Sequence, residues 1–495
     1  MVAVGIYSRK HAMSVDGFVL GGRSVGPWLT AFAYGTSYFS AVVFVGYAGQ
    51  FGWKYGLAST WIGIGNAVIG SLMAWVVLGR RTKVMTQYLN SKTMPDFFGS
   101  RYGSKPLKIA ASAIVFVFLV PYTASIYNGL SRLFEMAFHI PYAWCVIGMA
   151  VFTGIYVILG GYMATAINDF IQGIIMLVGI IVVIAAVLNG QGGFLEAVGK
   201  MAEIPSDVEI TLGQPGAFTS FFGPDPGNLL GVVILTSLGT WGLPQMIGKF
   251  YAIKDEKSIN TGTVISTVFA IVVSGGCYFL GGFARLFDAP AIYDEAGAVV
   301  YDSIIPHMLS ALPDILIGIV VVLVLSASMS TLASLVLTSS STLTLDFLKD
   351  NLLKEMSEKR QVRTMQVLVI FFIAVSVFIA LDPPTFIAQL MGISWGALAG
   401  AFLAPFLYGL YWKGTTRAGV WASFIVGVGI TVVNMFMPFI ESSINAGAAA
   451  MLAGLIVVPV VSLITPKLSR EKTDAIFSCY EEKVTITKKR SLEQN

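Results

Sequence analysis

The sequence predicts an all-α polytopic membrane protein. Of its 495 residues, 56% are hydrophobic and only 12% are charged, and the mean hydropathy is +0.77. A water-soluble fold with this composition would expose far more apolar surface than water tolerates. The apolar residues form twelve segments, each of roughly 20 residues, the length of helix that crosses a ~30 Å hydrocarbon core. These segments begin near Gly26, Leu57, Lys108, Ile140, Ala166, Gly227, Ser258, Asp314, Arg363, Pro384, Thr416 and Ser443.

The basic residues predict the orientation of these segments. Of the 31 Lys and Arg residues, 27 fall in alternate gaps between segments, and this set includes Lys249 after the sixth segment. The other gaps hold only Lys54, Arg132, Lys200 and Arg285. Cytoplasmic loops carry an excess of Lys and Arg. We therefore expect a multi-pass protein of the cell membrane with both ends of this chain in the cytoplasm.

The charge also bears on partners. A net charge of +4 reports loop orientation and not nucleic-acid binding, and we expect the basic runs 80–81 and 488–490 to meet anionic lipid headgroups. The three Cys and three His residues are scattered, so neither a disulfide framework nor a His/Cys metal site is indicated. The segments hold no paired acids or nucleophile set, which argues against an enzyme. The oligomeric state is left open.

We expect four parts along the chain. Residues 1–25 are interpreted as the remnant of a preceding helix and a cytoplasmic loop, because the apolar residues 1–7 are too few to span a membrane; a flexible terminus is the alternative. Residues 26–412 hold ten segments that would form a core. Residues 413–465 hold two peripheral membrane helices, and residues 466–495 form a short cytoplasmic tail.

The first and sixth segments are interrupted by small and polar residues at mid-membrane depth, at 35–40 and 239–245. Unwound backbone is tolerated there only where it lines a cavity, and its free carbonyls and half-helix ends can bind a cation and a polar solute. The breaks correspond if segments one to five and six to ten are repeats, which must have opposite topology because five is odd. Glycine used for helix packing is the alternative, and the matched pair disfavours it. The candidate solute-binding residues are Tyr38, Ser40, Thr240, Trp241 and Gln245.

The eighth segment places two hydroxyls beside one carbonyl. In a helix the side chains of Ser330 and Thr331 lie near the carbonyl of Ala327, because residues three and four positions on share its face. A small hard cation needs such a cluster of oxygens. The alternative is that the hydroxyls only bond the helix backbone or hold two helices together.

Asp169 is an ionisable residue within an apolar segment, at the predicted cytoplasmic start of the fifth. An acid at membrane depth indicates function. A helix N-terminus also favours Asp through its dipole, so both interpretations stand.

Five motifs in order resemble the sodium:solute symporter family, which includes sodium/proline, sodium/pantothenate and sodium/glucose symporters. They are Leu20 to Pro27, Gly160 to Gln172, Pro244 to Phe250, Ser330-Thr331 with Asp346, and Tyr408 to Arg417. The resemblance covers nearly the whole chain. It implies the leucine-transporter fold, with two inverted five-helix repeats and added peripheral helices.

The resemblance also implies a sodium site, with sodium as the only metal. It would use the backbone carbonyls of Thr36, Phe39 and Ala327 and the hydroxyls of Ser330 and Thr331. The family's acid at the start of the fifth core helix matches Asp169, which would influence sodium or its exit. Tyr38 stands where proline symporters place an Asp, which weakens the inference of proline specificity.

The expected function is sodium-coupled import of a small polar organic solute, an amino acid such as proline or a monocarboxylate, by alternating access. Sodium would favour the outward-open state and so raise solute affinity, and that coupling must be reciprocal. The alternative is a membrane sensor or regulatory protein that keeps the fold without transport.

Overall fold

The computed structural model describes residues 2–37, 39–353, 355–382 and 387–481. Helices dominate this part of the chain, where the only β-pairings are isolated bridges between Val25 and Ile253 and between Tyr293 and Val299. The all-α prediction is therefore confirmed. The helices are α1 (Val2–Ser8), α2 (Val15–Leu20), α3 (Pro27–Thr36), α4 (Ala48–Tyr55), α5 (Thr60–Gly65), α6 (Arg80–Tyr88), α7 (Met94–Tyr102), α8 (Lys105–Phe138), α9 (Tyr142–Gly190), α10 (Phe194–Glu203), α11 (Pro226–Leu238), α12 (Pro244–Ala252), α13 (Glu256–Phe269), α14 (Gly276–Gly281), α15 (Tyr301–Ser310), α16 (Asp314–Thr342), α17 (Glu358–Leu381), α18 (Ile387–Tyr411), α19 (Arg417–Phe436), α20 (Ser443–Ile464) and α21 (Arg470–Phe477).

In the described residues, ten helical stretches are long and apolar enough to cross a membrane. Two of them, Val42–Tyr88 with 47 residues and Tyr142–Gly190 with 49, are about twice as long as one crossing requires. Each is broken by a glycine with a left-handed backbone, Gly56 at φ +59° and Gly161 at φ +53°. Gly161 thus separates two full crossings, whereas Gly56 separates the second crossing from the second half of the first, whose first half is α3. Counted in this way, the ten stretches agree with the twelve segments expected from the sequence.

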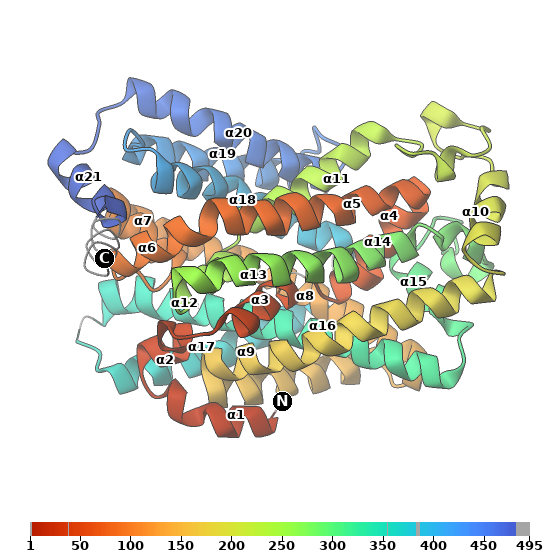
Figure 1. Ribbon diagram of the computed structural model, residues 1–495, viewed down its shortest axis with the longest axis horizontal. Coiled ribbons are helices and arrows are strands. Elements are labelled where there is room, and N and C mark those ends of the chain that lie inside the picture. The colour runs from red at the N-terminus through yellow and green to blue at the C-terminus, as the bar shows by residue number, and fades with distance from the viewer. Residues whose placement is uncertain (1, 38, 354, 383–386, 482–495) are drawn as a thin grey trace, which may run out of the picture.

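The helices form an elongated bundle whose two ends differ (Figure 1). Helices α10 and α15 lie at one end, and α2, α7 and α21 lie at the other. The end with α10 and α15 carries the loops that the basic-residue pattern assigns to the outside. The short helix α1 lies along α9 near its first half.

Both predicted helix breaks are present. Helix α3 ends at Thr36, and helical structure resumes as a π-helix at Val42–Tyr47, which leads into α4. In the sixth segment, α11 passes into a 3₁₀ turn at Gly239–Trp241 before α12 starts at Pro244. Proline suits the first turn of a helix, where its missing amide donor is not needed. A Cβ on Gly242 would lie 2.7 Å from the Ala399 Cα, so this break also lets α18 approach the backbone.

Helix α16 packs against α8 and α9 at the centre of the bundle, and α18 packs against α8. Helices α19 and α20 pack on α18 and on each other at one side. Helices α8, α9, α16 and α18 thus surround the two breaks. The candidate site lies there.

Candidate ion and solute site

The break after α3 brings free backbone carbonyls against α16. Helix α3 ends at Thr36. The carbonyls of Thr36 and Phe39 therefore lack the amide donors that a following helical turn would provide. Ser328 of α16 binds the start of the next half-helix, with the Ala41 amide donating to its Oγ at 3.1 Å. The broken segment is thereby held at a fixed position on α16.

Five oxygens gather between the two elements. The Thr331 hydroxyl lies 3.0 Å from the Thr36 carbonyl oxygen and 3.1 Å from the Phe39 carbonyl oxygen. The Ser330 hydroxyl lies 3.1 Å from the Thr36 carbonyl oxygen. The same hydroxyls lie 2.9 and 3.1 Å from the Ala327 carbonyl oxygen. The structure therefore brings together all five residues that the family resemblance assigned to sodium.

This cluster is rich in acceptors and poor in donors. Its two hydroxyls carry one proton each, and its three carbonyls carry none. All five residues are at most 1% exposed, so water does not reach the unused lone pairs. An electron-rich, buried set of oxygens suits a small hard cation.

A chain of polar side chains extends from this cluster to a buried ion pair. The Ser37 hydroxyl lies 2.8 Å from the Ser334 hydroxyl, which accepts a hydrogen bond from the Lys249 ammonium at 2.8 Å. Lys249 Nζ lies 3.8 Å from Asp169 Oδ2. Ser37 follows Thr36 directly in the chain, so the ion pair and the oxygen cluster share a connected polar network.

One expectation and one open alternative from the sequence are wrong here. Lys249 does not lie in a cytoplasmic gap: it belongs to α12 and its side chain is only 3% exposed. Asp169 does not cap a helix, because the break in α9 is at Gly161, two turns earlier, and the dipole effect fades within the first turn. One sequence feature could have identified Lys249 as part of the site. It lies four residues after Gln245, so the two side chains share one face of a helix.

The solute-binding candidates from the sequence do not form one cluster. Gln245 lines a small cavity of about 40 Å³ with Lys249 and Ser334, and both atoms of its amide lack a partner among the described residues. Thr240 donates to the Gly70 carbonyl at 3.0 Å, and the Trp241 indole donates to the Ile69 carbonyl at 2.9 Å. Their polar groups thus hold the sixth segment against the second.

Ser40 lies at the other break. It is fully buried, and its hydroxyl accepts from the Val42 amide at 3.2 Å. Tyr38 lies outside the described residues, so its assignment to the solute pocket stays a prediction.

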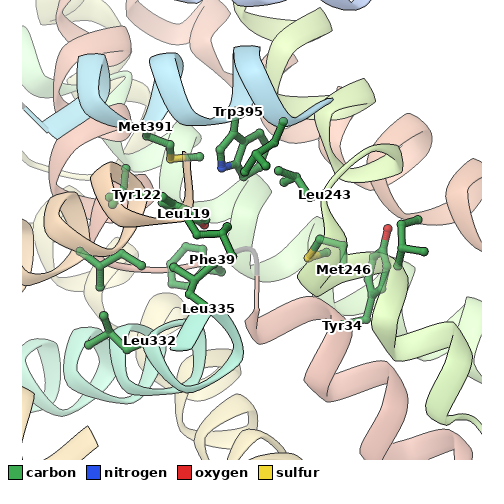
Figure 2. Packing of buried hydrophobic residues seen from close by; sticks show 14 of the residues in the cluster. Tyr34, Phe39, Leu119, Tyr122, Leu243, Met246, Leu332, Leu335, Met391 and Trp395 are labelled. Atoms are coloured by element: carbon green, nitrogen blue, oxygen red, sulfur yellow. The ribbon is translucent and has the colours of Figure 1, made fainter. Parts of the chain in front are cut away.

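Apolar side chains surround the first break (Figure 2). The Phe39 ring lies between Leu119 of α8 and Leu335 of α16, and Trp395 of α18 faces Leu243 above it. The rings of Tyr122 and Trp395 meet edge to face with centroids 5.9 Å apart. Tyr122 and Trp395 are not identified by the sequence pattern, because neither lies at a predicted helix break.

Comparison with known proteins places the fold and the family. The chain resembles a solved structure of a sodium-coupled sialic acid symporter in a substrate-bound outward-open state, with a TM-score of 0.74, 13% identity, and coverage of 94% of this chain and 96% of that one. It also resembles Mhp1, a nucleobase-cation-symport-1 family transporter, with a TM-score of 0.51, 13% identity, and coverage of 92% and 97%. These similarities confirm the predicted leucine-transporter fold.

Sequence comparison agrees. Sodium/proline symporters of Staphylococcus aureus strains JH9 and JH1 are each 30% identical to the chain over 491 residues, covering 95% of this chain and 91% of the relative. The model of the sodium:solute symporter family matches residues 18–427. The protein is a multi-pass membrane transporter and not an enzyme, as the sequence predicted. The chain belongs to the sodium:solute symporter family.

Proposed function

We propose that the protein imports a small polar organic solute, first of all an amino acid such as proline, by coupling its entry to sodium. The observation that carries the proposal is the five-oxygen cluster between the α3 break and α16. Sodium there would be held by the carbonyls of Thr36, Phe39 and Ala327 and the hydroxyls of Ser330 and Thr331. Each hydroxyl would turn its proton away and present a lone pair to the ion.

Coupling follows from where these ligands come from. Thr36 and Phe39 lie on the broken first segment, whereas Ser330 and Thr331 lie on α16, so the ion would hold the two elements together. A ligand that binds one arrangement better shifts the population towards it, and the solute and the ion then raise each other's affinity by the same factor. Ser40, a candidate solute-binding residue, lies on the same broken segment. A movement of this segment would therefore also move a predicted solute contact.

Aromatic and aliphatic side chains around the break support a solute with a compact apolar body. Phe39, Tyr122 and Trp395 are at most 1% exposed and come from three different elements. Such apolar surroundings favour the aliphatic ring or side chain of an amino acid over a sugar, whose hydroxyls need many hydrogen-bonding partners. Proline as the solute is supported by the named relatives, which are sodium/proline symporters.

For Asp169 we propose a role in the sodium pathway. Its carboxylate is fully buried and pairs with Lys249, which reaches the oxygen cluster through Ser334 and Ser37. A charge at this depth is rarely without function. An ion leaving the cluster on this side would meet the Lys249–Asp169 pair, in which Asp169 supplies the negative charge.

Uptake into proteoliposomes tests the proposal. With sodium outside and choline inside, labelled L-proline is expected to accumulate, and accumulation should stop when gramicidin collapses the gradient. Monocarboxylates and sugars serve as competing solutes. If no amino acid, monocarboxylate or sugar accumulates with sodium, the proposed transport function is wrong. The sensor or regulatory alternative then becomes the better account.

A further inference from the structure

The C-terminal helix α21 packs on the end of the bundle that the basic-residue pattern assigns to the cytoplasm (Figure 1). Ile476 and Phe477 at the end of this helix are buried, and Cys479 just after it is only 4% exposed. An ion pair between Lys413 and Asp474 also joins the tail to the bundle, but both side chains are about half exposed. Exposed ion pairs contribute little. The buried residues therefore hold the tail in place.

Two arginines lie beneath the tail. Arg101 of α7 is fully buried, and its guanidinium carbon lies 5.0 Å from the centroid of the Phe477 ring. The guanidinium carbon of Arg81, at the start of α6, lies 4.6 Å from the centroid of the Tyr480 ring. A cation over the face of an aromatic ring is attracted to it, and more strongly where water is excluded. Each of the two tail rings thus covers one positive charge.

The same two arginines bind the end of α18. Arg101 Nε donates to the Gly409 carbonyl at 2.9 Å, and Arg81 Nη1 donates to the Leu410 carbonyl at 3.1 Å. The Tyr480 hydroxyl lies 3.3 Å from the Arg81 carbonyl oxygen and 3.2 Å from the Leu410 carbonyl oxygen. The tail and the arginines together tie α6 and α7 to α18. We call Arg81, Arg101, Phe477 and Tyr480 the tail clasp.

The tail clasp joins the two inverted repeats. Helix α6 ends the second membrane segment and α7 follows it, so both belong to the first repeat. Helix α18 is the tenth segment and ends the second repeat. In transporters built from such repeats, alternating access is largely the movement of one repeat or bundle against the other around the binding site. Contacts that join the repeats at one end are therefore broken when that end opens.

The tail also keeps water from these contacts. A hydrogen bond is stronger in a low-dielectric interior than in water. Arg101 Nη1 has no hydrogen-bond partner among the described residues, and a buried charge without full pairing is costly. Release of the tail would let water reach this nitrogen and compete for the Gly409 carbonyl. Docking of the tail therefore strengthens the bonds between the repeats, and its release weakens them.

We propose that the tail clasp is a conformational strap. The docked tail holds the cytoplasmic end of the transport pathway closed, and release of the tail allows that end to open. The device acts on the movement of the repeats and not on the recognition of a solute. It therefore goes beyond the proposed function and can be tested without a transported solute.

Two cysteine positions report the two parts of the proposal. Cys479 reports docking, because it is buried under the docked tail. Thr338 reports opening, because it lines the small cavity beside the ion pair, together with Lys249 and Ser334. It lies one turn beyond Ser334 on the same face of α16, towards the predicted cytoplasmic end. A cysteine at position 338 should react faster when that end opens.

Thiol labelling of the full chain tests the strap. An impermeant maleimide is added to inside-out membrane vesicles, where it meets the cytoplasmic face. One protein keeps only Cys479, and the other carries Thr338→Cys with all three native cysteines replaced by alanine. Phe477→Ala should speed labelling at both positions by about 2- to 30-fold, which corresponds to the 0.5–2 kcal/mol of one cation–π contact.

Tyr480→Phe is the conservative variant. It keeps the ring over Arg81 and removes only the hydroxyl, so it should speed labelling at both positions by about 2- to 10-fold, the range for one hydrogen bond. It decides the test if the Phe477→Ala protein does not fold. The matched control is Glu471→Ala, an exposed position on α21, which should leave both labelling rates unchanged.

Equal labelling of Cys479 in the clasp variants and in Glu471→Ala would overturn the tail clasp. Faster labelling of Cys479 with an unchanged rate at Thr338→Cys would show that the tail is released without opening the pathway, and would overturn the strap. Faster labelling at both positions supports it. If both positions respond but sodium drives no uptake, the proposed import is wrong and the strap stands. If sodium drives uptake but neither position responds, the strap is wrong and the proposed import stands.

Discussion

Lys249 and Asp169 form a buried ion pair inside the helix bundle, with Nζ 3.8 Å from Oδ2 and side-chain exposures of 3% and 0%. Lys249 comes from α12, after the sixth-segment break, and Asp169 comes from the second half of α9. The Lys249 ammonium also donates to Ser334 of α16. Three helices of the core therefore share one pair of charges, and that pair adjoins the oxygen cluster.

Removing one member of this pair should destabilise the protein strongly. Asp169→Asn leaves a buried ammonium group without its counter-charge, a change that costs about 3–5 kcal/mol. The double variant Asp169→Asn with Lys249→Met should lose less than the sum of the two single variants. Thermal unfolding in detergent, arranged as a double-mutant cycle, measures this coupling. Simple additivity of the losses would show that the two charges do not interact.

Removing either hydroxyl of the oxygen cluster should weaken sodium activation of uptake. Ser330→Ala or Thr331→Ala takes away one neutral ligand and leaves the carbonyls of Thr36, Phe39 and Ala327. With about 1–3 kcal/mol for an unmade buried polar contact, the sodium requirement should rise roughly 5- to 150-fold. Thr331→Ser keeps the oxygen and should be milder.

The alternative role for these hydroxyls, holding two helices together, has a different outcome. The Ala variants would then lower the amount of folded protein, while the surviving fraction would keep its normal sodium response. Sodium activation measured at matched membrane expression distinguishes the two. An unaltered response in both variants would remove Ser330 and Thr331 from the ion site.

A close backbone contact between α4 and α14 should make Gly52 intolerant of substitution. A Cβ there would lie 1.8 Å from the Gly281 carbonyl oxygen, and rigid backbone atoms cannot turn aside as a side chain can. Gly52→Ala should therefore destabilise by at least about 1–3 kcal/mol. Gly148→Ala is the matched control, because its Cβ meets nothing within 4 Å. Equal thermal stability of the two variants would contradict this packing.

Asp302 should make stability depend on pH. Burial raises the pKa of this α15 carboxyl to about 6, and its Oδ2 accepts a hydrogen bond from the Ile387 amide at 3.1 Å. Because the pKa is higher in the folded state than the unfolded value of about 3.9, stability is greatest below pH ~4, falls as the pH rises to ~6, and is then flat.

Asp302→Asn removes this charge and keeps an acceptor for the Ile387 amide. At neutral pH it should stabilise the protein by up to about 3 kcal/mol, since each pKa unit corresponds to about 1.4 kcal/mol. Thermal unfolding of both proteins between pH 4 and 7.5 measures the effect. A wild-type curve with the same pH dependence as Asp302→Asn would show that Asp302 does not cause it.

Thiol labelling should report the orientation. The native cysteines Cys145, Cys277 and Cys479 are buried, so an added cysteine dominates labelling by an impermeant reagent. Cysteine at Asp294 should react in intact cells, and cysteine at Lys472 should react only after permeabilisation. The opposite pattern would reverse the predicted topology.

Local sequence patterns predict the class of the protein and much of its oxygen cluster. Apolar length predicts membrane helices wherever it occurs, and glycine with polar residues at mid-membrane depth predicted the breaks near Thr36 and Thr240. Ser330 and Thr331 lie three and four residues after Ala327, so local helix geometry brings their hydroxyls to its carbonyl. The motifs that resemble the sodium:solute symporter family supplied Thr36 and Phe39 as their partners.

Contacts between residues distant in the chain follow only from how the helices pack. Lys249 resembled a loop lysine in the sequence, and only the tertiary structure shows that its side chain reaches from α12 to Asp169 of α9. Thr240 and Trp241 are predicted solute ligands, and only the tertiary structure shows that both also donate hydrogen bonds to backbone carbonyls of the second segment. Local sequence pattern determines where helices form and how their side chains are spaced. The burial of a side chain and its hydrogen-bond partners depend on how the helices pack. Apolar segments of similar composition do not encode which of their faces meet.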